Sequence, residues 1–179
     1  MRLTLSLTLA FGIGLGGCGG SSGTGSAGGN GNGGGNGSGN GVGSAGSAAV
    51  QHNLDALNAY RKEAGSPALV LSDPLNDFAT VGSQQLADGG QPHAHFGSTN
   101  VFDHGFCSGA GENQAPGWGI DHSDTNATID GILKAMMDEG PGGGHHDNIL
   151  NPKFALVGIG LVVRDDGLWF TNDFSNACD

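Results

Sequence analysis

Histidine and glutamate side chains collect in two parts of the chain, residues 91–120 and 139–154. The second part contains GGGHHDNILNPKF, which places two imidazoles after a triple glycine and before a one-turn helix that Asn151-Pro152 ends. Neutral imidazoles are good ligands for a divalent transition metal such as Zn²⁺, and nearby carboxylates could orient them or act as a general base. A single histidine beside a glycine loop is more often a surface or capping residue, so this stretch alone does not establish a site. The candidates are His93, His95, His104, Glu112, Glu139, His145 and His146.

Three helices and a late hairpin must position these side chains. Apolar residues recur at three- and four-residue spacing in three segments, which predicts amphipathic helices. Residues 67–72 fit a strand or an extended link, and residues 91–120 form a long irregular stretch. Asp166-Gly167 predicts a two-residue hairpin turn that requires positive φ. Helices followed by an antiparallel hairpin predict an α+β domain with a layered sandwich architecture. The expected helices are residues 49–64, 73–88 and 125–139, and the expected strands are residues 155–164 and 168–174.

The sequence of residues 1–48 is typical of an export signal followed by a linker. Residues 1–18 combine Arg2, an apolar run too short to span a bilayer, and LGGC, which resembles the bacterial lipobox that ends in a lipid-modified cysteine, here Cys18. The alternative is an ordinary secretory signal that happens to contain a cysteine. Residues 19–48 are nearly all Gly, Ser, Asn and Ala without charge, so we expect a disordered linker. Residues 49–179 are then the single folded domain.

Net charge and cysteine content limit the possible partners and predict a disulfide. The formal net charge is −11, and the few Lys and Arg residues beyond the signal are scattered, which argues against a nucleic-acid partner. Apart from Cys18 the chain has two cysteines, Cys107 and Cys178. In an exported protein this pair predicts one disulfide. Catalytic use of Cys107 is the weaker alternative, because an oxidising compartment disfavours a free thiol.

Several motifs carry a family resemblance. Residues 144–160, GHHDNILNPKFALVGIG, are similar to the pattern GHR-x-NIL-N-P-x-F-x-x-VG-x-G, and GEN at 111–113 matches a signature tripeptide of the same family. Residues 57–69 resemble its opening helix, and WFTNDF at 169–174 is similar to its closing strand. The family is the CAP superfamily, or SCP domain, which includes cysteine-rich secretory proteins, antigen 5 and pathogenesis-related class 1 proteins. The resemblance looks closest to the bacterial secreted branch. It implies a three-layer α-β-α sandwich with a central antiparallel sheet over residues 49–179.

The resemblance also implies a cleft lined by two histidines and two glutamates. Carried over by position, Glu112 comes from GEN, His145 from GH, and Glu139 from the family's W-x-x-E, in which Met136 stands where the Trp would be. A Zn²⁺ ion with two histidine ligands, one of them His145, is the possible cofactor. Two histidines alone bind weakly, and no third firm protein ligand is evident, so zinc is a hypothesis. The candidates for the first histidine are, in order of preference, His95, His104 and His93.

Three functions fit these observations. We favour a recognition module, anchored to a membrane through Cys18 in the periplasm or at the cell surface, that binds a small ligand, lipid, glycan or peptide in the cleft. A secreted form without the anchor is the alternative location. A metal-assisted hydrolase is the second candidate, although the chain has neither HExxH nor G-x-S-x-G. The third is a structural domain without a catalytic role.

Overall fold

The computed structural model describes residues 44–115, 117–120 and 122–178. The expected signal, with Cys18 at its end, and all but the last residues of the expected linker lie outside these residues, so the lipid anchor stays a prediction. No helix in the described part of the chain is both long and apolar enough to cross a membrane. The elements, in order, are α1 (Ser44–Ala64), β1 (Val70–Leu71), α2 (Asp73–Ala87), α3 (Ala94–Ser98), the 3₁₀ helix η1 (Val101–His104), β2 (Ala110–Ala115), α4 (Thr125–Met137), α5 (Gly144–Leu150), β3 (Phe154–Arg164) and β4 (Gly167–Asn176).

The four strands form one sheet in the order β1-β3-β4-β2. β3 and β4 form the expected antiparallel hairpin, and β2 pairs with β4, also antiparallel. The two-residue β1 adds to the far edge in parallel through Val70↔Leu156 and Leu71↔Val157. β2 was not predicted, because it lies inside the stretch expected to be irregular. Its sequence, AGENQA, has no β-branched or aromatic residue, so only main-chain pairing with β4 identifies it as a strand.

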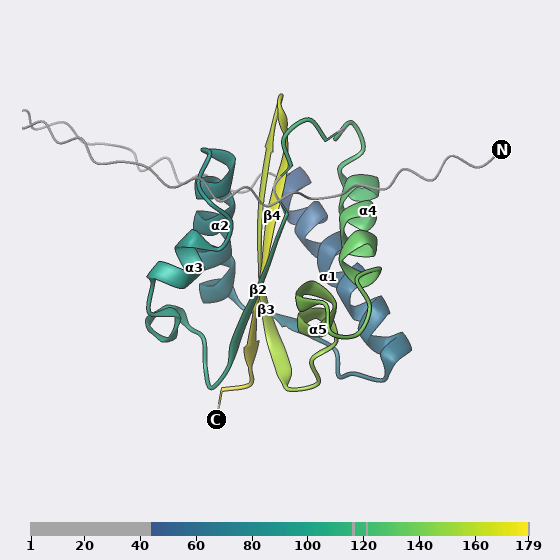
Figure 1. Ribbon diagram of the computed structural model, residues 1–179, viewed down its shortest axis with the longest axis vertical. Helices are drawn as coiled ribbons and strands as arrows, with labels where there is room; N and C mark the ends of the chain where they lie inside the picture. Colours follow the sequence, from purple (N-terminus) through teal and green to yellow (C-terminus); the bar gives the residue numbers. More distant parts are fainter. Residues whose placement is uncertain (1–43, 116, 121, 179) are drawn as a thin grey trace, which may run out of the picture. The chain divides into compact units, whose positions relative to one another are not determined.

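Helices cover both faces of this sheet, which confirms the α+β sandwich (Figure 1). α2, with α3 beside it, packs on one face, and α1, α4 and α5 pack on the other. α2 approaches very closely because β3 presents glycines to it. A Cβ on Gly158 would lie 2.1 Å from the carbonyl oxygen of Leu75, and one on Gly160 would lie 2.2 Å from that of Ala79. The Ser83 hydroxyl then donates to the Gly160 carbonyl at 3.1 Å, so polar as well as apolar contacts hold α2 on the sheet.

The main hydrophobic core lies on the opposite face, between the sheet and the helices α1, α4 and α5. α1 and α4 contribute apolar side chains at helical spacing to this core, which explains why the periodicity predicted those helices correctly. α1 begins at Ser44, five residues before the expected start, and α4 ends at Met137, two residues before the expected end. The fully buried members are Leu57, Ile129, Leu133, Ile149, Val157, Leu168, Phe170 and Phe174.

Arg61, at the C-terminal end of α1, is completely buried. Its guanidinium has no carboxylate partner among the described residues and donates to four main-chain carbonyls. The distances are 2.6 Å to Pro67, 2.7 Å to Ile149, 3.1 Å to Asn151 and 2.8 Å to Phe154. Because a buried charge is costly unless hydrogen bonds satisfy it, these contacts fix α1 against the segment that joins α5 to β3.

The hairpin turn differs from the expected one. β3 ends at Arg164, which pairs with Gly167, so the two loop residues are Asp165 and Asp166, and neither has positive φ. Gly167 is instead the first residue of β4. A Cβ there would lie 2.1 Å from the carbonyl oxygen of Gly117, so this glycine is required for close approach of another segment and not for a left-handed turn.

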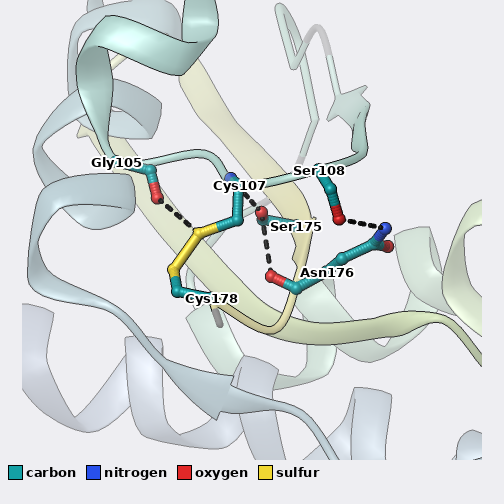
Figure 2. Close-up of a disulfide and its surroundings, with 6 residues drawn as sticks. All are labelled: Gly105, Cys107, Ser108, Ser175, Asn176 and Cys178. Carbon is teal, nitrogen blue, oxygen red and sulfur yellow. Dashed lines mark hydrogen bonds between the residues drawn. A yellow bond between two sulfur atoms is a disulfide. The ribbon is translucent and has the colours of Figure 1, made fainter.

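The expected disulfide between Cys107 and Cys178 is confirmed (Figure 2). It ties the end of β4 to the loop before β2. The Ser175 hydroxyl accepts a hydrogen bond from the Cys107 amide at 2.8 Å and donates to the Asn176 carbonyl at 3.1 Å, beside the bridge. The C-terminal strand is therefore held at its end by a covalent bond and by a local hydrogen-bond network.

Candidate functional site

Glu112, the central residue of GEN, lies in β2 on the face of the sheet that α2 covers. Its Oε2 would lie 3.7 Å from a Cβ placed on Gly82 of α2. The Glu112 side chain is only 1 % exposed, and its Oε1 accepts a hydrogen bond from His93 Nδ1 at 2.8 Å. Oε2 is buried and has no partner among the described residues. The structure therefore gives this carboxylate one imidazole partner and leaves its second, buried oxygen unpaired among the described residues.

His93 is held in place by an unusual backbone conformation. Its φ is 64°, and it is the only non-glycine residue with positive φ in the described ranges. The His93 amide donates to the Gln114 side-chain carbonyl at 2.6 Å, so β2 fixes both its main chain and its ring. The ring is half exposed. The hydrogen bond that the His93 ring donates to Glu112 raises the pKa of His93, burial acts against this, and the Glu112 charge adds to it.

A second histidine–glutamate pair forms where α4 leads into α5. His145 Nδ1 donates to Glu139 Oε1 at 2.5 Å, and the His145 amide donates to Glu139 Oε2 at 3.1 Å. The intervening loop turns back sharply through Gly140 and Gly142, which both have positive φ. Burial acts to raise the pKa of Glu139, but the hydrogen bond and charge of His145 and the amides of His145 and His146 together hold it below its ordinary value. The glycine-containing loop thus brings His145 back to Glu139.

Two asparagines connect the pairs through β2. The Asn113 side chain donates to the His145 carbonyl at 3.1 Å. The Asn148 amide lies 2.9 Å from Asn113 Oδ1 and 3.3 Å from the Glu112 carbonyl. Because successive side chains of a strand point to opposite faces, Glu112 faces α2 while Asn113 faces α5. The two histidine–glutamate pairs therefore flank the edge strand β2 on its two faces.

His95, the preferred first histidine, has no hydrogen bond to Glu112, although the Glu112 charge acts on its ring. Its ring centroid is 4.2 Å from that of Phe78, and its buried Nε2 has no hydrogen-bond partner among the described residues. Burial lowers the pKa of His95. His104 also lies against Phe78, at 5.2 Å, and both histidines line a cavity of about 440 Å³ with Asp77. The residue bonded to Glu112 is thus His93, the third in our order of preference, and a ligand role for His95 stays a prediction.

Sequence reasoning missed Asp173 of β4. It is fully buried directly opposite Glu112 in the strand register, and neither of its carboxylate oxygens has a hydrogen-bond partner among the described residues. Burial, followed by the negative charge of Glu112, raises the pKa of Asp173 well above its ordinary value. The signal that could have found it is an aspartate within WFTNDF, because aspartate is almost never fully buried in a central strand unless it is paired.

The two histidine–glutamate pairs share one arrangement of hydrogen-bonding groups. In both pairs Nδ1 faces a carboxylate, and Nε2 has no protein partner in the part of the chain that the structure describes. A carboxylate on one ring nitrogen fixes the tautomer and leaves the other nitrogen to accept a hydrogen bond or bind a metal. Among the described residues, no group of three or more His, Cys, Asp or Glu side chains converges as a metal site. The four-residue cleft and a zinc site therefore stay predictions.

Comparisons with known proteins agree with this fold. A model of the CAP family, described as the cysteine-rich secretory protein family, matches residues 54–174. No curated protein matches the sequence. An extracellular protein with an SCP domain from Bacillus anthracis str. Ames is 27 % identical with a TM-score of 0.54, and the match covers 73 % of this chain and 41 % of that chain.

Two further solved structures share the fold at lower identity. A cysteine-rich secretory protein from Staphylococcus aureus is 17 % identical with a TM-score of 0.55, covering 73 % of this chain and 39 % of that one. An outer surface protein from Borrelia burgdorferi is 18 % identical with a TM-score of 0.57, covering 73 % and 94 %. The chain thus spans about two fifths of the length of the Bacillus and Staphylococcus proteins and nearly all of the Borrelia protein.

Proposed function

Because the chain belongs to the cysteine-rich secretory protein (CAP) family, we propose that it is an exported module that recognises a small ligand at its two histidine–glutamate pairs. The similar proteins from Bacillus anthracis and Borrelia burgdorferi are described as extracellular and as an outer surface protein, which supports an exported location. The Cys18 motif and the residues after it support attachment to a membrane through a lipid, with the domain carried on a flexible tether.

The observation that carries the proposal is the common geometry of the two pairs. Each imidazole is oriented by a carboxylate, at 2.8 Å for His93 and 2.5 Å for His145, and each keeps Nε2 available. Both pairs are fixed to β2, one through Gln114 and one through Asn113, so they do not have to be ordered when a ligand binds. Pre-ordered polar groups of this kind give specificity for a ligand with complementary polar atoms.

We extend the proposal to a weakly held Zn²⁺ ion, bound through the Nε2 atoms of the two imidazoles. An imidazole that donates from Nδ1 to a carboxylate is the usual arrangement of a zinc-ligating histidine, and Glu112 and Glu139 would then be the orienting carboxylates. Zinc would supply Lewis acidity to a bound ligand or water. With two histidines as the protein ligands we expect affinity no tighter than micromolar, because structural zinc sites use four protein ligands.

A binding experiment separates recognition from the other two functions. The chain without its predicted signal is tested on arrays of lipids, glycans and peptides, titrated with Zn²⁺ by calorimetry, and incubated with fluorogenic peptides and esters. We expect array binding by the wild type that is lost in Glu112→Gln and His145→Ala. A matched control is His146→Ala, whose ring bonds to Asp147 on the same helix.

Two results would overturn the proposal. Turnover by the wild type that disappears in folded His145→Ala protein would identify a hydrolase. Loss of the thermal unfolding transition in both pair variants, with His146→Ala unaffected, would identify a structural role for the pairs.

Membrane attachment has its own test. Cells expressing the full chain are fractionated, and Cys18→Ser is compared with the wild type. We expect the wild type in the membrane pellet and the variant in the soluble fraction, because a lipid chain on Cys18 is the proposed anchor. Equal distribution of the two proteins would show that the signal is an ordinary secretory one.

A further inference from the structure

A second cavity, of about 600 Å³, lies at the β3–β4 turn. The bridge between Trp118 and Gly167 places it at one end of β4, six residues before Asp173, so it is roughly 20 Å along the strand from the histidine–glutamate pairs. Nothing in the proposed function uses it. Its lining residues are Trp118, Gly119, Ile120, His122, Asp165 and Asp166.

Trp118 is an aromatic side chain that packs on one side against the protein and is half exposed. Its ring meets that of the buried Trp169 edge-to-face at 5.3 Å. Its main chain is fixed as well, because the Gly119 amide donates to the Asp166 carbonyl at 2.9 Å and the Leu168 amide donates to the Gly117 carbonyl at 3.3 Å. A large aromatic ring that packs against a buried ring on one side and is exposed on the other is typical of a binding surface.

The polar groups of this cavity are nearly all hydrogen-bond acceptors. Asp165 and Asp166 have no side-chain hydrogen bond or ion pair with another described residue. His122 Nδ1 donates to the Ile120 carbonyl at 3.0 Å, so the neutral ring offers Nε2 as a further acceptor. The neighbouring cation, Arg164, is already bound to Asp88 at 2.5 Å and to the Ala87 carbonyl at 2.9 Å.

From this geometry we propose that the cavity binds the guanidinium group of an arginine side chain on a basic peptide segment. A guanidinium is planar and always charged, stacks on an indole face, and carries five N–H donors for the carboxylates and the imidazole. The protein already shows the stacking contact once, since the Arg164 guanidinium lies 5.8 Å from the centroid of the Trp169 ring. The net charge of −11 favours the approach of such a partner.

The test compares two peptides that differ only in charge. Acetyl-Gly-Arg-Gly-amide and its citrulline analogue, a neutral isostere, are titrated into the full chain while tryptophan fluorescence is recorded. Trp118 and Trp169 are the only two tryptophans, and Trp169 is fully buried, so a ligand at the cavity reports mainly through Trp118. We expect saturable binding of the arginine peptide that weakens with rising salt, and none of the citrulline peptide.

Substitutions test whether the fluorescence change comes from binding at this cavity. The double substitution Asp165→Asn with Asp166→Ser should weaken binding by roughly tenfold or more, and Trp118→Leu should do the same by calorimetry. Glu63→Gln, which removes an exposed charge from α1, should leave affinity unchanged. Equal binding of the citrulline peptide, equal binding of a lysine peptide, or full affinity in the folded double variant would each overturn the assignment to a guanidinium, as would no saturable signal at all.

Discussion

Glu112 and Asp173 lie directly opposite each other on β2 and β4, and three of their four carboxylate oxygens have no hydrogen-bond partner among the described residues. The fourth, Glu112 Oε1, accepts from His93. Burial, followed by the negative charge of Glu112, raises the pKa of Asp173 and so favours its protonated form. A change in the protonation of Asp173, inside the sheet, would therefore make the region around Glu112 sensitive to pH.

The first prediction concerns Asp173→Asn. The folded-state pKa of Asp173 is raised, so the folded protein holds a proton that the unfolded chain releases near its ordinary pKa, about 3.9. Wild-type stability should therefore fall as pH rises from about 4 through the raised pKa, by at most about 1.4 kcal/mol per pH unit from this group. Urea unfolding should show a free-energy difference between variant and wild type that grows with pH. A constant difference between pH 4 and pH 8 would contradict this account.

The second prediction concerns the titration of His93. Glu112→Gln removes the hydrogen bond to a carboxylate that is the main cause of the raised pKa, so the pKa of His93 should fall. By linkage, the pair stabilises the fold below the unfolded histidine pKa, about 6.5, and this contribution is lost as pH rises through the raised pKa. NMR titration of the His93 ring proton measures the shift, with His93→Ala to assign the signal. An unchanged pKa would show that Glu112 is not its partner in solution.

The backbone at His93 provides a third prediction. A left-handed φ of 64° is strained for any residue with a Cβ. Both His93→Ala and His93→Gly remove the ring, but only glycine also relieves the strain. The glycine variant should therefore be more stable than the alanine variant by about 1 kcal/mol, measured by urea unfolding. The opposite order would mean that this conformation is not adopted.

The fourth prediction uses two glycines with opposite surroundings. Gly160→Ala places a methyl group against the α2 backbone at 2.2 Å and should destabilise the protein by about 3 kcal/mol or more. Gly131, exposed in the middle of α4, has nothing within 4 Å, so Gly131→Ala should stabilise it by about 0.5–1 kcal/mol through helix propensity. Thermal unfolding of the two variants under identical conditions tests the contrast. Similar effects in the two would argue against close contact between α2 and β3.

The fifth prediction concerns the disulfide. Cys107 and Cys178 are 71 residues apart, and the chain-entropy model gives about 4 kcal/mol for a loop of that length. Cys107→Ser with Cys178→Ser should lower the free energy of unfolding by about this amount, and a reducing agent should have the same effect on the wild type. Reductant should not affect the double variant further. If reduction leaves the wild-type melting temperature unchanged, the bridge is not formed.

The sequence predicted most of the fold because the relevant signals are local. Apolar spacing predicted α1, α2 and α4, and the long β-prone runs predicted β3 and β4. β2 was missed because its residues have low strand propensity and its pairing partner lies about sixty residues later, from Ala110↔Ser175 to Ala115↔Phe170. The turn was misplaced by one residue because the need for glycine at 167 comes from the distant Gly117 carbonyl.

The candidate site was only partly predictable for the same reason. Glu139 and His145 are six residues apart, and a glycine loop is sufficient to join them. Which of the three candidates, His93, His95 or His104, bonds to Glu112 depends on which ring lies next to β2, and the sequence did not predict that strand. Gln114, which holds the left-handed backbone of His93, has no local sequence signal of that role. Long-range register, not composition, decides which histidine meets Glu112.

Arg61 couples α5 to α1 across a long stretch of the sequence. The carbonyl of Ile149 in α5 accepts a hydrogen bond from a guanidinium 88 residues earlier, so α5, which carries His145, loses this contact if α1 is displaced. A protease that nicks α1 would thus unseat the Glu139–His145 pair without touching it. The half of the candidate site that α5 carries therefore depends on an arginine of α1, so damage to the first helix would affect a pair of residues more than seventy positions later.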